Sequence, residues 1–318
     1  MQKLRLFQDF WAVNFLYIFV IFVSPIKFIT PNFKACMSSI SQLLKENNPH
    51  EDILAIAGSL GEKENIPTYI VGGYVRDTLL GKSCKDIDIM VEGDGVAFAK
   101  KLARELKVNV TVDYDKFGTA MIPYPDVEIE VATARIEKYR SDSRKPEVTS
   151  STIEEDMSRR DFTINAIAAS LLPSSFGELY DPFGGIKDLQ KGLIITPLDP
   201  DETFSDDPLR MLRAVRFAAQ LEYDVASTIL ESISRNINRL EIVSWERIRD
   251  EIIKSLTTNK PSIAFYLMKE TGLLTHVFPE MDIMSGVETI NGMGHKDVFI
   301  HTLQVVDNAA KLSDKMEI

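Results

Sequence analysis

Two aspartates one residue apart, Asp86 and Asp88, lie in an otherwise apolar stretch of the sequence. If residues 85–91 form a strand, the alternation of side chains places both carboxylates on one face. Two carboxylates this close repel each other, so the ionised pair needs a cation nearby. Oxygen ligands without histidine or cysteine suit Mg²⁺. The pair therefore predicts a magnesium site, although two solvated acids on an edge strand would have the same spacing.

A glycine-rich turn precedes the two aspartates. Gly72 and Gly73 follow a short apolar strand expected at residues 69–71 and lead into a helical turn. Glycines allow the backbone to approach an anion closely with its N–H groups exposed. Arg76 adds a charge-assisted donor one turn later. An anion cradle beside a metal-binding pair is what a nucleoside triphosphate with bound Mg²⁺ requires.

A two-metal site needs a third carboxylate. Glu128 and Glu130 alternate on a strand expected at residues 127–133, so they share one face. We predict Glu130 as the third catalytic residue beside Asp86 and Asp88, with Glu128 as the alternative. A pair of surface acids would have the same spacing.

Several motifs in a fixed order now resemble one family. The run from Gly72 to Gly81, followed by Asp-x-Asp, resembles the head domain of class II CCA-adding tRNA nucleotidyltransferases and bacterial poly(A) polymerases, of the polymerase-β superfamily. Further along the chain, RRDFTINA (159–166) looks like that family's sugar-recognition motif, DDPLRMLRAVRF (206–217) like its base-templating helix, and GHKD (294–297) with His301 like the opening of an HD domain.

The sugar-recognition motif has a plausible physical basis. Asp161 and Asn165 are four residues apart, so they share a face if the segment is helical. A carboxylate fixed by a neighbouring arginine can accept a hydrogen bond from a ribose 2′-OH, and a deoxyribose would leave that acceptor unpaired at a cost of about 1–3 kcal/mol. The resemblance assigns this role to Arg160 and Asp161. The competing interpretation is a structural salt bridge at a helix end.

In the base-templating motif, charged residues recur every three positions. We expect one helix that begins near Ser205 and carries a slanted stripe of four charges: Asp207, Arg210, Arg213 and Arg216. Alone, such a stripe is typical of a solvated face. Cytosine and adenine, however, both present an amino donor beside a ring-nitrogen acceptor. Asp207 can accept from the amino group and Arg210 can donate to the ring nitrogen. Arg213 and Arg216 would then contact phosphate or stack on the nucleotide.

Together with these features, the resemblance implies a template-independent enzyme that adds C and A to the 3′ end of tRNA from CTP and ATP, with Mg²⁺ as cofactor and pyrophosphate as product. A poly(A) polymerase and a partial enzyme that adds only A or only C remain alternatives. So does a nucleotide-binding regulatory module fused to an HD domain. The polar segment Glu137–Ser151, expected to be a long mobile loop, favours A addition, because C-adding relatives lack such a loop.

Composition sets the wider frame. The net charge is −11, which argues against a wholly basic nucleic-acid coat and favours tRNA over poly(A) addition. Two cysteines form neither a disulfide framework nor a zinc spacing, which fits the cytoplasm. The apolar run at 10–23 is short for a membrane span. An over-extended start before Met37 is favoured, with a membrane anchor or targeting segment as the alternative.

We expect an α+β fold, with a small mixed sheet followed by an all-helical region. Four parts are predicted. They are an apolar extension (1–36), a catalytic head (37–195), a helical neck and RNA-binding body (196–285), and the start of an HD domain that is incomplete within the chain (286–318). The adjacent His-Asp pair that an HD metal site needs does not occur before Ile318, so no metal is assigned there. No protein partner is evident.

Overall fold

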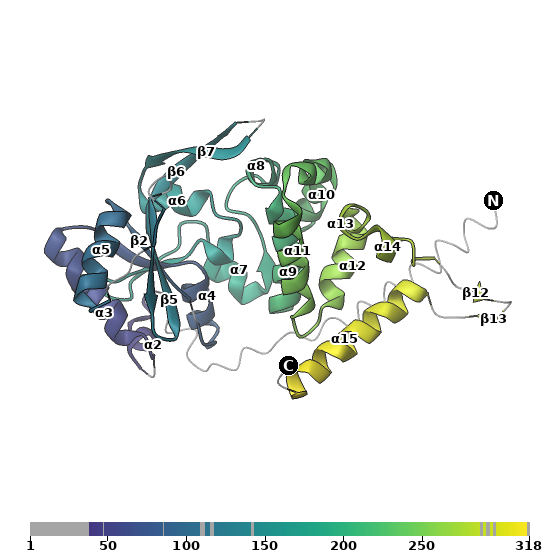
Figure 1. The fold of residues 1–318 in the computed structure, drawn as a ribbon, viewed down its shortest axis with the longest axis horizontal. Coiled ribbons are helices and arrows are strands. Elements are labelled where there is room, and N and C mark those ends of the chain that lie inside the picture. Colours follow the sequence, from purple (N-terminus) through teal and green to yellow (C-terminus); the bar gives the residue numbers. More distant parts are fainter. Residues whose placement is uncertain are drawn as a thin grey trace. The chain divides into compact units, whose positions relative to one another are not determined.

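The structure is a computed structural model (Figure 1). It describes residues 38–46, 48–84, 86–108, 112–114, 118–140, 143–286, 289–290, 293–294 and 297–316. The apolar run at 10–23 and the residue His295 lie outside this range. No helix in the described part of the chain is long and apolar enough to cross a membrane.

A seven-stranded mixed sheet carries the two aspartates. Its order is β3-β4-β5-β2-β1-β8-β9. The strands are β1 (Thr68–Val71), β2 (Asp86–Val91), β3 (Val112–Tyr114), β4 (Thr119–Tyr124), β5 (Val127–Thr133), β8 (Ala168–Ser170) and β9 (Leu179–Tyr180). Only β2 and β5 run parallel, and the other neighbouring strands are antiparallel. The α+β class with a mixed sheet is confirmed.

The two faces of the sheet differ in what covers them. On one face, Ile87 and Ile89 are buried beneath α3 (Glu51–Glu64) and α5 (Gly95–Glu105), which pack on the sheet and on each other. On the other face, polarity changes along β2. Met90 lies in a core cluster, Asp88 is half-buried and Asp86 is exposed. The carboxylates therefore occupy the open end of a face whose other end is apolar core.

The segment expected to be a mobile loop forms a β-hairpin instead. Strands β6 (Arg135–Arg140) and β7 (Ser143–Ser150) pair antiparallel with one irregularity in register. The polar composition and Pro146 suggested a loop, but every second residue of an edge ribbon can face water, so polarity does not exclude strands. At the foot of the hairpin, the N–H of Ala134 donates to Val91 O and the N–H of Ser151 donates to Ala134 O, which anchors it to the sheet.

After the sheet the chain is mostly helical, as expected. The remaining elements of the head are α2 (Ser41–Lys45), α4 (Gly73–Leu79), α6 (Ile153–Ser158), η2 (Thr163–Asn165), η3 (Pro173–Ser175) and α7 (Gly185–Lys191). The helical part contains α8 (Pro200–Asp206), α9 (Leu209–Leu221), α10 (Ser227–Asn236), η4 (Ile237–Ile242), α11 (Trp245–Leu256), α12 (Ser262–Thr271), α13 (Leu273–Val277), α14 (Pro279–Asp282) and α15 (Val298–Met316). Short pairs β10–β11 (Leu193–Ile194, Asp224–Val225) and β12–β13 (Thr289–Ile290, Met293–Gly294) complete the list. Helices α11 and α12 both pack against α9 (Figure 1).

The base-templating segment does not form one helix from Ser205. Helix α8 ends at Asp206 and α9 starts at Leu209, with Asp207 in an extended conformation between them. Pro208 explains the break, because a proline disfavours helical backbone at the residue before it. Asp207 therefore lies just before the N-terminus of α9, the helix that carries Arg210, Arg213 and Arg216.

The close approach of Gly58 on α3 to Leu171, the residue after β8, gives a test of how α3 packs on the head. A Cβ at Gly58 would lie 1.8 Å from Leu171 O, so Gly58→Ala must push α3 away from the backbone it covers. We expect a loss of about 1–3 kcal/mol in the free energy of unfolding, although alanine has the higher helix propensity. Urea unfolding measures this. Ser59→Ala, exposed on the same helix, is the control and should change stability by less than about 0.5 kcal/mol. An unchanged midpoint for Gly58→Ala would contradict the packing.

Candidate active site

The acidic face is built by two parallel strands in register. Asp86 lies beside Glu128, and Asp88 lies beside Glu130. Neighbours in register share a face, so all four carboxylates lie on the same side of the sheet. Both glutamates are exposed. Either one can therefore serve as the third carboxylate, and the choice of Glu130 stays a prediction.

The two aspartates differ in environment. Burial raises the pKa of Asp88; the nearby Arg160 guanidinium opposes this effect and the charge of Asp86 adds to it, so the pKa stays above its ordinary value. In the described part of the chain, no three His, Cys, Asp or Glu side chains form a ready-made metal cluster. A pair of carboxylates is nevertheless enough for Mg²⁺, which in such sites takes its other ligands from substrate phosphates and water.

The glycine turn leads from β1 into α4. Gly72 has φ +68° and ψ −128°, a backbone conformation that residues other than glycine rarely adopt. A Cβ at Gly72 would lie 2.7 Å from Nη1 of Arg160. Gly73 is the first residue of α4. The sequence therefore needs glycine at position 72 both for its backbone angles and for the close approach of a guanidinium.

Arg76 is not directed to an open cradle. Its side chain is only 5% exposed and donates to both carboxylate oxygens of Asp77, at 2.8 and 2.7 Å. Its Nη1 donates to Oδ1 of Asn165 at 2.7 Å. Arg76 thus connects α4 to η2, and the phosphate contact expected of it stays a prediction that the described contacts do not support.

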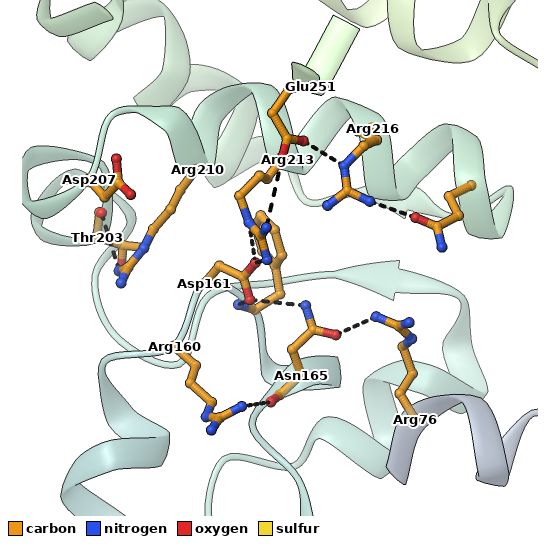
Figure 2. A network of polar contacts seen from close by, with 12 residues as sticks. Arg76, Arg160, Asp161, Asn165, Thr203, Asp207, Arg210, Arg213, Arg216 and Glu251 are labelled. Carbon is orange, nitrogen blue, oxygen red and sulfur yellow. Dashed lines mark hydrogen bonds and ion pairs between the residues drawn. The ribbon is translucent and has the colours of Figure 1, made fainter. Parts of the chain in front are cut away.

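Asp161 is the centre of the polar network in Figure 2. One oxygen accepts from the N–H of Phe162 at 2.8 Å and from Nδ2 of Asn165 at 3.0 Å. The other accepts from Nε and Nη2 of Arg213 at 2.8 and 2.5 Å. Burial alone would raise the pKa of Asp161, but the Arg213 charge and these hydrogen bonds outweigh it and lower the pKa to about 2. A carboxylate offers about four acceptor positions, and protein donors fill four here.

The expected base-reading pair lies at the start of α9. Oδ1 of Asp207 accepts from the N–H of Leu209 at 3.1 Å, and Oδ2 lies 3.2 Å from Nη2 of Arg247 on α11. Arg210 donates from Nη2 to Arg159 O at 2.7 Å and from Nη1 to Thr203 O at 3.5 Å. Both side chains are thus held by the protein at one end of the helix (Figure 2).

The stripe of arginines divides into different roles. Arg213 binds Asp161, as described above. Arg216 is 7% exposed; its Nε donates to Glu251 at 2.6 Å and its Nη1 to Gln220 at 2.6 Å. Its guanidinium also lies 4.0 Å from the ring centroid of Phe217. The expected contact of Arg216 with nucleotide stays a prediction that these contacts do not support, because Nε and Nη1 are bonded inside the protein.

Sequence reasoning missed three charged residues of this network. Asp156 is fully buried and pairs with both Arg159 and Arg160. Its position three and four residues before these arginines was a usable signal. Glu251 and Arg247 come from α11, and only the packing of α11 on α9 identifies them as partners.

Asp297, in the segment expected to open an HD domain, caps α15 by accepting a hydrogen bond from the N–H of Ile300 at 3.1 Å.

Comparisons with known proteins show which family the chain resembles. Residues 68–195 match the poly A polymerase head domain, and residues 222–284 match the probable RNA and SrmB-binding site of polymerase A. The solved Thermotoga maritima CCA-adding enzyme complexed with tRNA_CCA is similar with a TM-score of 0.67 at 33% identity, over 87% of this chain and 68% of that one. The chain belongs to the class II CCA-adding enzyme and poly(A) polymerase family.

Two curated members of the family show how much of it the chain covers. The A-adding tRNA nucleotidyltransferase of Geobacter sulfurreducens is 34% identical over 83% of this chain and 28% of its own length. The multifunctional CCA protein of Nitrosomonas europaea is 35% identical over 79% of this chain and 59% of its own length. The chain therefore spans less than two thirds of both of these relatives.

The Asp161 environment gives a pH-dependent test. A depressed carboxyl pKa contributes stability above the unfolded-state pKa and loses it as the pH falls through the folded-state value. With a folded-state pKa of about 2, against 3.8 for the ordinary value, Asp161→Asn should cost about 2–4 kcal/mol at pH 7. The difference from the parent should stay constant down to about pH 4 and shrink between about pH 4 and pH 2. Denaturant unfolding at several pH values measures it.

The exposed Asp250, changed to Asn, is the matched control and should stay within about 0.5 kcal/mol of the parent at every pH. A parent–variant difference for Asp161→Asn that does not depend on pH would show that the ion pair with Arg213 does not form.

Proposed function

We propose that the chain carries the catalytic head of a tRNA nucleotidyltransferase, an enzyme that adds C and A to the 3′ end of tRNA from CTP and ATP and releases pyrophosphate. One observation carries the proposal. Asp86 and Asp88 share the open end of a sheet face with Glu128 and Glu130, next to the strand that ends in the Gly72 turn. Carboxylates beside a tight backbone turn suit a triphosphate and its metal.

Enzymes of this family generally use divalent metal ions, and we propose Mg²⁺ here. Asp86 and Asp88 would hold it, with Glu130 as the third carboxylate. When bound, the metal would lower the pKa of the attacking 3′-hydroxyl and neutralise charge on the triphosphate. The chain itself supplies two fixed oxygen ligands on a rigid strand, whose register with β5 sets the spacing of the acids.

Base choice is assigned to the start of α9. Asp207 would accept from the amino group of cytosine or adenine, and Arg210 would donate to the ring nitrogen. The protein holds Asp207 through Leu209 N and Arg247 and holds Arg210 through two main-chain carbonyls. A guanidinium has five N–H donors, so the two main-chain contacts can orient Arg210 without using all of its donors.

An enzyme that adds only A is the second candidate. The relative from Geobacter sulfurreducens is an A-adding enzyme, whereas that from Nitrosomonas europaea is a multifunctional CCA protein. Poly(A) addition remains a third candidate within the family. The division into a head (37–195), a neck and RNA-binding body (196–285) and the start of an HD domain (286–318), and a cytoplasmic location, belong to the same proposal.

Product analysis separates these candidates. The protein is incubated with Mg²⁺, each labelled NTP and tRNA ending before CCA, after C or after CC, and the product ends are sequenced. CCA addition predicts incorporation of C, C and A in order. A-only addition predicts a product only on tRNA ending in CC, and poly(A) addition predicts runs longer than one A. No incorporation on any of them would refute the proposed function.

The carboxylate pair should separate catalysis from stability. Asp88→Asn should abolish transfer, because it removes a metal ligand. Since the folded-state pKa of Asp88 is raised, its protonated form is favoured in the fold, and that stability is lost as the pH rises through the folded-state value. The variant should therefore melt at the same temperature as the parent or higher at pH 7 without divalent metal. Glu105→Gln, exposed on α5, is the charge-matched control. Strong residual transfer by Asp88→Asn would contradict the metal assignment.

Base discrimination tests the start of α9. Arg210→Ala should reduce the preference for CTP and ATP over UTP and GTP by about 1–3 kcal/mol, roughly 5- to 150-fold. The measurement is kcat/KM for the four NTPs with parent and variant. Arg249→Ala, an exposed arginine on α11, is the control and should leave the preference unchanged. Lower activity with the same preference would mean that Arg210 only supports the α8–α9 junction.

A further inference from the structure

We propose that Arg159 is a positioning residue for base choice: its main-chain carbonyl orients the guanidinium of Arg210, and the buried carboxylate of Asp156 holds Arg159 in place. Arg159 itself touches neither the nucleotide nor the metal. The proposal deepens the proposed function and rests on it, because it requires that Arg210 reads the base. It adds a residue of the head to a recognition pair that otherwise lies at the start of α9.

The contact between Arg210 and Arg159 is the first argument. Nη2 of Arg210 donates to the main-chain oxygen of Arg159 at 2.7 Å, whereas Nη1 donates to that of Thr203 on α8 at 3.5 Å (Figure 2 shows the Thr203 contact). The first distance is that of a short hydrogen bond, and the second is beyond the usual range. The orientation of the guanidinium is therefore set mainly from the head, by a residue 51 positions earlier in the chain.

The end of α6 explains why this carbonyl can accept from Arg210. Arg159 is the C-cap residue of α6. The last carbonyls of a helix have no partner within the helix, so they accept from side chains or water. A guanidinium has five N–H donors, so Arg210 can donate to this carbonyl and still present N–H groups to a base.

Asp156 holds the side chain of Arg159. Its carboxylate is fully buried, and Oδ1 accepts from Nε of Arg159 at 3.1 Å and also from Nη2. Helix α6 has six residues, so few backbone hydrogen bonds restrain its last turn. The ion pair adds a restraint on the residue whose carbonyl Arg210 uses. Oδ2 of Asp156 faces Arg160, so the buried charge keeps one partner if Arg159 is replaced.

The start of α6 is tied to the strand of the two aspartates. The N–H of Ile153, the first residue of α6, donates to the carboxylate of Glu92 at 2.8 Å, and Glu92 directly follows β2. Helix α6 thus connects β2 at its start with Arg210 at its end. A shift in the last turn of α6 would move the base-reading guanidinium relative to the acids of β2, which is why the anchoring of Arg159 matters for base choice.

The test measures the affinities of the full chain for CTP, ATP, UTP, GTP and inorganic tripolyphosphate, with Mg²⁺, by calorimetry. Arg159→Ala should reduce the preference for CTP and ATP by about three- to thirtyfold, less than Arg210→Ala, because the guanidinium remains and loses only its orientation. Tripolyphosphate has no base and should bind like the parent. Circular dichroism and urea unfolding confirm that each variant is folded.

Two further variants separate ion pairing from side-chain bulk. Arg159→Met keeps much of the side-chain length but cannot pair with Asp156, so it should lose the preference as Arg159→Ala does. Arg159→Lys keeps the charge and should retain most of the preference. Arg249→Ala removes an exposed, ion-paired arginine from α11 and is the matched control, which should bind every ligand like the parent.

A double variant tests the route through Arg210. Arg159→Ala combined with Arg210→Ala should show the same preference as Arg210→Ala alone, because Arg159 acts only through that guanidinium. Additive losses would overturn the proposal, and so would an Arg159→Ala protein with the preference of the parent. If tripolyphosphate and CTP were weakened by the same factor, Arg159 would act on phosphate binding, and the proposal would again fail.

Failure of the proposed function gives a different pattern. Parent protein that prefers CTP and ATP in binding, with the expected dependence on Arg159, yet transfers neither nucleotide to tRNA would refute the proposed function alone. Parent protein that binds all four NTPs alike would overturn the present proposal, since there would be no base preference for Arg159 to support.

Discussion

The ion pair between Asp161 and Arg213 determines how the two halves of the candidate site meet. Asp161 lies three residues after the end of α6 in the head, whereas Arg213 lies in the middle of α9, 52 residues later. Asp161 is buried, whereas 33% of the Arg213 side chain is exposed. A buried charge is tolerated only when it is paired and hydrogen-bonded. Four hydrogen bonds satisfy Asp161. One of the donors, Asn165, also accepts a hydrogen bond from Arg76 on α4, the helix that follows the Gly72 turn. A single carboxylate thus fixes α9 relative to the strands that carry the acids.

Around this pair the structure collects more positive charge than one aspartate can balance. Three guanidiniums lie within 5.4 Å of the ring centroid of Phe217, those of Arg76, Arg213 and Arg216. The aromatic face contributes a favourable interaction with each, but no net charge. Asp77 balances Arg76, and Glu251 supplies the third negative charge: it is 3% exposed, 2.6 Å from Arg216 and 3.9 Å from Arg213. Helix α11 is therefore required for more than apolar packing, because without its carboxylate the stripe on α9 would bury unbalanced cations.

The sequence predicted most elements of the fold, because they depend on local patterns. Alternation in β2 and β5 placed the acids on one face, and the structure has both strands with that alternation. The predictions were wrong where the local structure cannot be inferred from composition or residue spacing alone. Polar edge strands at 135–150 resemble a loop in composition, and Pro208 interrupts what the arginine spacing suggested was one helix. In the site, residue types were identified but not their partners. A guanidinium every third residue looks the same whether it faces a nucleotide or, like Arg216, a glutamate 35 residues away.

The division of the network has a consequence for chemistry. The groups proposed to hold metal and phosphate lie on β2 and at the Gly72 turn of the head. The pair proposed to read the base lies at the start of α9, whose own contacts run to α8 and α11 through Arg210 and Asp207. The Asp161–Arg213 pair and the bond from Arg210 to the carbonyl of Arg159 join the two parts, and the Arg76 guanidinium lies 5.2 Å from the ring centroid of Phe217 on α9. On the proposed assignments, changes at the start of α9 should alter base choice and leave the carboxylates of β2 in place. A change at Arg213 should instead alter how α9 is held against the head, and small displacements of a reacting group are costly in rate.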